Sequence, residues 1–275
     1  MDVMMRRSSF TARFSFLTRF PFVTRGMIRH LLLLSSLGCL WTGLAAAAPP
    51  KDEGPQPRAV DPGSATLAPS DAVVLFDGRD VAQWVRAKDG EPCRCSVEDG
   101  AMACLTGVGD IVSKEKFRDA QIHLEFMTPN MPDQHSQMRG NSGVYLHGKW
   151  EIQILDSYHN PTYADGAVGA LYGQAAPLVN PARAPELWST YDIVFHAPRC
   201  DAWGNVTDLA TVTVLLNGIL VQDHMTIARS GQDKGCADGP IQLQDHSGFP
   251  GAPLTKMRFR NIWFRHLDQG PVIWK

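Results

Sequence analysis

Strand-length runs of apolar residues, separated by turn residues, constrain the fold of this chain more than any other feature. Between residues 72 and 265, Val, Ile, Phe, Tyr and Thr gather in short runs bounded by Gly, Pro, Asn and Asp, as β-strands do. No stretch of 12 or more residues carries a helical apolar stripe. The pattern predicts a single all-β domain of about 200 residues, a sandwich or jelly roll. The clearest runs are 72–76, 121–127, 143–147, 151–155, 190–196, 211–216, 219–223, 241–244 and 256–265.

The first 70 residues differ in composition from this domain. Residues 1–47 contain six arginines, an apolar run from Leu31 to Leu44 and a stretch of alanines, which together predict a secretory signal peptide. Met27 is an alternative start that gives a more typical length. Residues 48–70 hold six prolines and predict a linker. We therefore expect a periplasmic or secreted protein with its domain at 71–268 and a tail at 269–275.

Charge and hydropathy exclude two classes of partner. The chain has 26 basic and 28 acidic residues, and six basic and one acidic residue lie in 1–47, which leaves 20 and 27. An excess of acid argues against nucleic acid and anionic surfaces as partners. The apolar run in the leader is shorter than the roughly 20 residues of a membrane helix, and no second long run follows, so no membrane span is expected in the mature chain.

Two tight turns fix the register of their hairpins. Asn217-Gly218 predicts a type I′ turn that pairs Leu216 with Ile219 and Val214 with Val221. Asp99-Gly100 predicts a second such turn.

Five cysteines follow the leader, and the second hairpin brings two of them together. Its register places Cys95 opposite Cys104 as a non-hydrogen-bonded pair, with Cα atoms about 4.5 Å apart, close enough for a disulfide. Export makes disulfide formation more favourable. We expect the disulfides Cys95–Cys104 and Cys200–Cys236, with Cys93 as a competing partner for Cys104.

A third hairpin carries polar residues on one face. Val144 and Leu146 alternate with Asn141, Tyr145 and His147, and then Ile152 and Ile154 alternate with Glu151 and Gln153. Both apolar rows must face the core, which requires an odd loop. A loop of residues 148–150 pairs His147 with Glu151 and Tyr145 with Gln153. The sequence thus predicts one polar patch of Tyr145, His147, Glu151 and Gln153.

The same alternation recurs in residues 239–246. Ile241 and Leu243 point inward, so Gln242, Gln244 and His246 point outward. A sheet face rich in Gln, Glu, His and Tyr suits sugar binding, because amides and carboxylates bond hydroxyls and aromatic rings cover the apolar face of a sugar. A solvated outer face and a divalent metal site are the alternatives. No motif requires a cofactor, and there is no G-x-S-x-G, phosphate loop or H-E-x-x-H.

The ordered set of motifs resembles the 3-keto-disaccharide hydrolase family. The resemblance implies a concanavalin A-like jelly-roll β-sandwich and a small carbohydrate substrate, a 3-keto-glycoside. The motifs that carry it are 75–80, 139–144, 151–157, 169–174, 188–192, 212–223, 239–246 and 258–263.

The implied chemistry is a base-catalysed β-elimination, followed by hydration for a net hydrolysis. A ketone at C3 acidifies the proton at C2, so a base can remove it and the glycosidic oxygen can leave C1. Glu151 and His246 are the expected base and acid, in an order that the sequence does not give. Arg139, Arg260 or a metal ion would polarise the ketone, and Asp156 could instead support a loop. The expected substrate-binding residues are Arg139, Asn141, Tyr145, His147, Gln153, Asp156, Tyr172, Gln174, Gln244 and Arg260.

Two other functions fit the same residues. A non-catalytic carbohydrate-binding module would use this fold equally well. An ordinary glycoside hydrolase needs two carboxylates about 5 to 9.5 Å apart, and Glu151 has no such partner within its hairpin.

Overall fold

A computed structural model describes residues 57–228, 236–247 and 254–267 of the chain. The chain divides into compact units at 1–52 and 53–275, and the described residues all belong to the second unit. The expected signal peptide, residues 48–56 of the expected linker and the tail at 269–275 lie outside the described residues.

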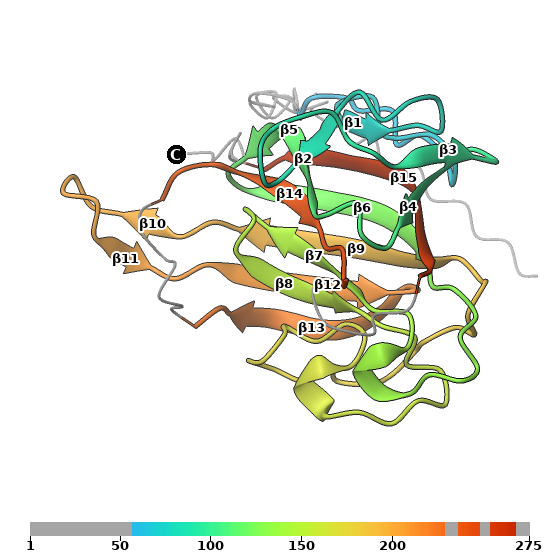
Figure 1. Cartoon of the computed structure of the whole chain (residues 1–275). Helices are drawn as coiled ribbons and strands as arrows, with labels where there is room; N and C mark the ends of the chain where they lie inside the picture. The colour runs from blue at the N-terminus through green and yellow to red at the C-terminus, as the bar shows by residue number, and fades with distance from the viewer. Residues whose placement is uncertain (1–56, 229–235, 248–253, 268–275) are drawn as a thin grey trace, which may run out of the picture. The chain divides into compact units, whose positions relative to one another are not determined.

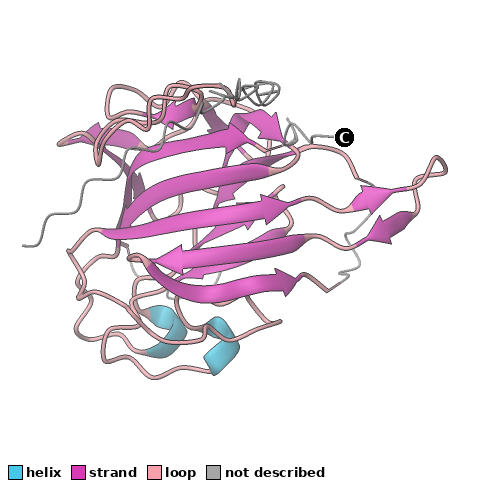
Figure 2. Cartoon of the chain, turned by 180° about the vertical axis from the view of Figure 1, so that it is seen from behind, coloured by secondary structure: helices cyan, strands magenta, loops and turns pink. Residues whose placement is uncertain are grey.

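Two antiparallel sheets face each other across an apolar core, which is the predicted jelly-roll sandwich. Figure 1 looks onto the smaller sheet, and Figure 2 shows the larger sheet from behind. The smaller sheet has the order β2-β5-β14-β7-β8, and the larger has β13-β12-β9-β6-β15-β4-β3 with β1 paired to β15. In the smaller sheet the strands are β2 (Trp84–Arg86), β5 (Ile111–Phe117), β7 (Ser142–Leu146), β8 (Trp150–Ile154) and β14 (Gly239–Leu243).

The remaining strands form the larger sheet and a separate hairpin. The larger sheet contains β1 (Val73–Phe76), β3 (Ser96–Glu98), β4 (Ala101–Leu105), β6 (Ala120–Met127), β9 (Ser189–His196), β12 (Thr211–Leu216), β13 (Ile219–Thr226) and β15 (Lys256–His266). The hairpin pairs β10 (Arg199–Cys200) with β11 (Val206–Asp208). Single 3-10 turns, η1 (Ser136–Met138) and η2 (Ala164–Gly166), lie in the loops below β7 and β8 in Figure 1.

Strict alternation along the strands builds the core. In β6 every second residue is buried, from Ala120 to Phe126, and β9 repeats this pattern. Across the core, Val144, Leu146 and Ile152 are fully buried, as the sequence predicts. Because a shift by one residue would turn each row of apolar side chains to solvent, this alternation fixes the register of both sheets.

The β12–β13 hairpin follows the predicted register only near its turn. Leu216 pairs with Ile219 as predicted, but Val214 pairs with Gln222 instead of Val221, because the register shifts between these pairs. The shift buries Gln222, whose Nε2 donates to Gly169 O at 2.9 Å. A side-chain hydrogen bond to a distant loop thus accounts for the irregularity.

Both disulfides predicted from the sequence are present. Cys95 and Cys104 lie opposite each other across the β3–β4 hairpin, with Cα atoms 4.4 Å apart. Cys200 in β10 is joined to Cys236, shortly before β14. Cys93 carries a free thiol.

The described part of the expected linker, 57–70, is a loop held against the domain. Arg58 pairs with Asp71 at 2.7 Å, and Asn261 donates to Ala65 O. Asp71 also pairs with Arg265 in β15, at 2.6 Å. Within the residues that the structure describes, no helix is long and apolar enough to cross a membrane.

Candidate active site

The β7–β8 hairpin has the predicted parity but a different register. Its three-residue loop is 147–149 rather than 148–150, so Tyr145 faces Glu151 and Gly143 faces Gln153. The predicted pairs of His147 with Glu151 and of Tyr145 with Gln153 are wrong by two residues. The apolar rows still point inward, because a shift by two leaves the faces unchanged.

His147 is not on the polar face, contrary to the sequence prediction. It is the first residue of the turn, with φ at 55°, and its ring points into the core. The ring lies 4.9 Å from the rings of Phe117 and Phe195, and its Nε2 lies 3.1 Å from Arg118 O. Burial lowers the pKa of His147 to about 4, so the ring is neutral at neutral pH. The prediction assumed that strand alternation continues to His147, but His147 already belongs to the turn, where side chains do not alternate between the two faces.

A row of side chains crosses the outer face of the smaller sheet and ends at Glu151. Paired residues share a face, and successive partners from β2 to β8 are Val85, Val112, Gln242, Tyr145 and Glu151. Apolar side chains thus occupy one end of the row and polar ones the other.

The Glu151 carboxylate is partly buried and held in place. Tyr145 Oη donates to Glu151 Oε2 at 2.8 Å and accepts from Gln244 Nε2 at 3.0 Å. Glu151 Oε1 lies over Gly143, where a Cβ would come within 2.2 Å of it. Burial raises the pKa of Glu151 to about 7, the Tyr145 hydrogen bond lowers it, and the charge of Asp110 raises it. A carboxylate with this pKa can take up and release a proton near neutral pH.

Three amide side chains beside Glu151 present acceptor oxygens. Gln137 Oε1 accepts from Asn141 Nδ2 at 3.1 Å and from Gln153 Nε2 at 3.0 Å, which fixes both amides. Asn141 Oδ1, Gln153 Oε1 and Gln244 Oε1 are buried and have no hydrogen-bond donor within the described residues. Buried acceptors call for donors such as hydroxyl groups; a hard cation is the other group that amide oxygens hold.

Gln137 is a site residue that the sequence did not reveal. It belongs to η1, in a loop without periodicity, and it is brought to Asn141 and Gln153 only by the tertiary fold. No pattern in the sequence marks it.

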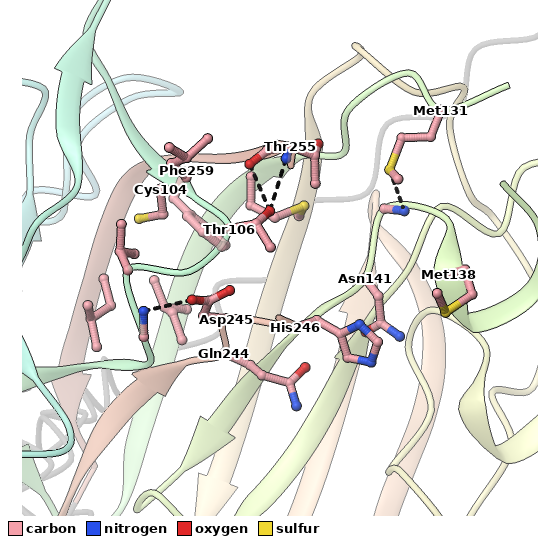
Figure 3. Close-up of a pocket in the computed structure, with 17 residues that line it drawn as sticks. Cys104, Thr106, Met131, Met138, Asn141, Gln244, Asp245, His246, Thr255 and Phe259 are labelled. Atoms are coloured by element: carbon pink, nitrogen blue, oxygen red, sulfur yellow. Dashed lines mark hydrogen bonds between the residues drawn. The ribbon is translucent and has the colours of Figure 1, made fainter. Parts of the chain in front are cut away.

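His246 follows β14, next to a narrow pocket. Figure 3 shows His246 near Asn141, and both residues line this pocket, together with Gln244 and Met138. His246 is half-buried, and burial lowers its pKa while the charge of Asp245 raises it. Gln244 bonds to Tyr145 and also lines this pocket with His246, so the site continues from Tyr145 to the pocket.

Asp245 anchors this end of β14. Its Oδ2 accepts from the backbone N–H groups of Gly107 and Gly109, at 2.8 and 2.7 Å, and one of these bonds is drawn in Figure 3. Its own N–H donates to Asp110 Oδ1 at 2.8 Å. These bonds fix the segment that carries Gln244 and His246.

Arg139 and Asp156 form a buried ion pair. Arg139 Nε lies 2.8 Å from Asp156 Oδ2, and the guanidinium also donates to Tyr158 O. Asp156 additionally accepts from Tyr158 N and is almost fully buried. The pair ties together the loops before β7 and after β8, which agrees with the alternative that Asp156 supports a loop.

Arg260 and Gln174 lie apart from this cluster. Arg260 is in β15 of the larger sheet, where it pairs with Glu125 at 2.6 Å and covers the Trp188 ring at 4.1 Å. Its expected place beside Glu151 is therefore wrong, because the motif that contains it belongs to the opposite sheet. Gln174 Oε1 accepts from Ala228 N at 2.8 Å and so holds two loops together.

A metal centre of the usual ligand types is not visible in the described segments. They contain no group of three or more His, Cys, Asp or Glu residues that could hold a metal ion.

A jelly roll with a proton-active carboxylate, a tyrosine and acceptor amides on one sheet face belongs to the class of carbohydrate-active enzymes. The chain is a member of the family of 3-keto-alpha-glucoside-1,2-lyase-like domains, whose match covers residues 71–265.

Two solved structures resemble this chain. The chain is 41% identical to a candidate glycosyl hydrolase from Parabacteroides distasonis ATCC 8503, with 79% of this chain and 95% of that chain covered and a TM-score of 0.72. A second candidate glycosyl hydrolase from the same organism is 19% identical, covers 72% and 94%, and has a TM-score of 0.52, which shows the fold alone. None of the curated proteins matches the chain.

Proposed function

We propose that this domain cleaves 3-keto-glycosides by β-elimination, with Glu151 as the base. The observation that carries the proposal is the Glu151 carboxylate, whose pKa of about 7 suits proton abstraction at neutral pH. Membership of a family described by a 3-keto-alpha-glucoside-1,2-lyase supports the choice of substrate.

The steps balance without a redox partner. Glu151 takes the proton from C2, and the electron pair forms an enolate with the C3 ketone. The enolate collapses, C1 and C2 form a double bond, and the C1–O bond breaks. The departing oxygen takes a proton, which leaves an alcohol and a 2-hydroxy-3-keto-glucal. Addition of water across the double bond then completes a net hydrolysis.

The residues around Glu151 have different roles in this reaction. Tyr145 donates to Glu151 Oε2 and so stabilises the ionised base. The free oxygens of Asn141, Gln153 and Gln244 accept from sugar hydroxyls. We assign His246, at the pocket end of the site, to the proton that the leaving oxygen takes, although burial lowers its pKa and makes the protonated ring the minor form at neutral pH.

Purified full-length protein incubated with a 3-keto-disaccharide and with its unoxidised parent tests the proposal. We expect cleavage of the keto sugar alone, followed as enone absorbance and as released sugar. Glu151→Gln should lower kcat by at least about 100-fold. If Glu151→Gln and His246→Ala both leave turnover intact, the site is wrong. A parallel arm with a chelator separates a metal-assisted reaction from one carried by side chains alone.

Asp110 gives an ordinary glycoside hydrolase some support. Its charge acts on Glu151, so the two carboxylates lie on the same part of the face. However, Asp110 already accepts from Gln242 Nε2 at 2.7 Å and from Asp245 N at 2.8 Å. We therefore assign Asp110 to holding β5 against β14, and cleavage of the unoxidised parent in the same assay would reverse this choice.

We also propose that the protein acts after export, in the periplasm or outside the cell. The leader and the two disulfides support this location, because disulfides persist in oxidising compartments. Cell fractionation, with an antibody against the domain, tests it: recovery in the cytosol with reduced thiols would contradict it.

A further inference from the structure

The proposed elimination needs a hydrogen-bond donor that the side chains described so far do not supply. Removal of the C2 proton puts negative charge on the C3 oxygen, and donors aimed at such an oxygen are usually the largest single contribution to catalysis. Tyr145 already donates its hydroxyl proton to Glu151, and the three amides beside it present free acceptor oxygens, which would repel an enolate. Arg139 and Arg260 are each held in an ion pair with another carboxylate. The enolate therefore needs a different donor.

A short segment at 169–172 brings a tyrosine to the outer edge of β8, beside Glu151. The segment forms three backbone hydrogen bonds of 3.0 Å with Glu151 and Gln153, and in one of them Tyr172 N donates to Glu151 O. Residues opposite each other in an antiparallel pair have Cβ atoms about 5 Å apart. Burial and Glu151 raise the pKa of Tyr145, and Tyr172 adds to this effect, which places Tyr172 near both residues. A base at C2 and a donor at the C3 oxygen must be close neighbours, as Glu151 and Tyr172 are.

A second tyrosine hydroxyl contacts the first. The hydroxyl oxygens of Tyr163 and Tyr172 lie 2.6 Å apart, and either hydroxyl can be the donor. Tyr163 packs against Gly166, where a Cβ would come within 2.1 Å of its ring, and Gly166 O accepts from Gln153 Nε2. Burial raises the pKa of Tyr163, as do its hydrogen bond to Tyr172 and the charge of Glu151, so its hydroxyl keeps its proton at neutral pH. The two phenols, the carboxylate and the amides thus form one cluster.

We propose that Tyr172 donates a hydrogen bond to the C3 oxygen of the substrate and stabilises the enolate, and that Tyr163 positions Tyr172 by donating to its hydroxyl. When Tyr163 donates within the pair, the proton of Tyr172 is left for the substrate. Glu151 takes the C2 proton, the electron pair spreads to the C3 oxygen, and Tyr172 keeps its own proton throughout. The inference rests on the proposed function and extends it, because it assigns the donor that the elimination requires.

Tyr172→Phe and Tyr163→Phe test the inference, because each keeps its ring and loses one hydroxyl. On a 3-keto-glycoside, Tyr172→Phe should lower kcat by about 100-fold and leave KM within about threefold, since the hydrogen bond strengthens only as charge develops. Tyr163→Phe should lower kcat by about tenfold. It should have no further effect when Tyr172→Phe is already present, because it acts through that hydroxyl. Tyr158→Phe is the matched control and should behave like the wild type, since Tyr158 is 41% exposed and Tyr172 is 39% exposed.

A second measurement separates enolate formation from bond cleavage. The 3-keto form of anhydroglucitol carries no leaving group at C1, so removal of its C2 proton can be followed by NMR as exchange with deuterium oxide. Tyr172→Phe should slow this exchange by the same factor as it lowers kcat on the glycoside. Tyr158→Phe should exchange at the wild-type rate.

The outcomes separate this inference from the proposed function. Exchange at the wild-type rate in Tyr172→Phe, or a change in KM alone, would overturn the inference and leave the elimination by Glu151 intact. Additive losses from the two Phe variants would contradict the positioning role of Tyr163. If the wild type neither exchanges the C2 proton nor cleaves the 3-keto-glycoside, the proposed function is wrong and the inference is wrong with it.

Discussion

At the scale of single residues, burial raises the pKa of Glu151, and the same burial makes the folded state less stable once the carboxyl group ionises. Below pH 4.5 the carboxyl group is protonated in the folded and unfolded chain alike. As the pH rises to about 7, only the unfolded chain ionises freely, so the folded state loses stability over this range. His147 acts in the opposite sense, because its neutral ring resists protonation as the pH falls from 6.5 to about 4. The two effects partly cancel in the wild type.

Because the ionised Glu151 destabilises the folded state, replacing it with a neutral side chain should stabilise the protein. Glu151→Gln keeps an acceptor for Tyr145 and removes the buried charge, so unfolding at pH 8 should require up to about 3 kcal/mol more. At pH 4 the difference should be small. Urea denaturation at both pH values measures it. Glu98→Gln is the control, because Lys256 lowers the pKa of Glu98 and the same change should give no gain. Equal effects of Glu151→Gln at both pH values would show that the charge is not the cause.

Loss of the tyrosine hydroxyl should shift the pH dependence of catalysis. Tyr145→Phe removes the hydrogen bond that lowers the pKa of Glu151. The acidic limb of kcat/KM should move to higher pH, with about a tenfold loss at pH 6 and less at pH 8.5. Tyr158→Phe, on a loop tyrosine, serves as the control. A uniform loss at all pH values would mean that Tyr145 binds substrate without tuning the base.

At the scale of elements, the β7–β8 hairpin positions the base through a missing side chain. Gly143 has an ordinary strand conformation, yet it leaves the space that Glu151 Oε1 occupies. A glycine is therefore needed here to leave room for the Glu151 carboxylate, and the backbone conformation does not require it.

Gly143→Ala should separate stability from activity. The clash falls on the far end of a flexible side chain, so the fold should lose only about 1 kcal/mol. Displacement of the carboxylate should lower kcat by about 100-fold. A double-mutant cycle with Glu151→Asp provides the control, because the shorter side chain relieves the clash and should reduce the effect of Gly143→Ala. Additive effects would disprove the steric coupling.

Strand periodicity predicts well which face of a sheet a side chain lies on, and it predicts poorly where a strand ends. The alternation around Val144 and Ile152 correctly identified the face that carries Tyr145 and Glu151. It misplaced His147, because that residue has already entered the turn, and it gave no information on which sheet holds Arg260. Gln137 reaches the site from a loop, where no period exists to be read.

At the scale of the whole molecule, the two disulfides close stretches of chain of very different length. Cys95–Cys104 closes a separation of 9 residues within one hairpin, whereas Cys200–Cys236 closes 36 residues between the β10–β11 hairpin and the start of β14. The longer closure removes more freedom from the unfolded chain.

Removal of each disulfide should therefore cost different amounts. Loop entropy gives about 3 kcal/mol for Cys95→Ser/Cys104→Ser and about 4 kcal/mol for Cys200→Ser/Cys236→Ser. Urea denaturation of both double variants, with Cys93→Ser in each background to exclude a new pairing, measures the difference. The opposite order would indicate that the unfolded chain is not the main source of the effect.

The segment at 169–172 has a consequence for the behaviour of the protein at high concentration. An open strand edge invites another chain to pair with it, and a flat polar face next to such an edge gives little protection. Here the backbone groups of β8 on that side are already bonded to this short segment. The outer face of the smaller sheet can therefore stay exposed to solvent, while the edge of β8 has no free backbone groups on that side with which another chain could pair.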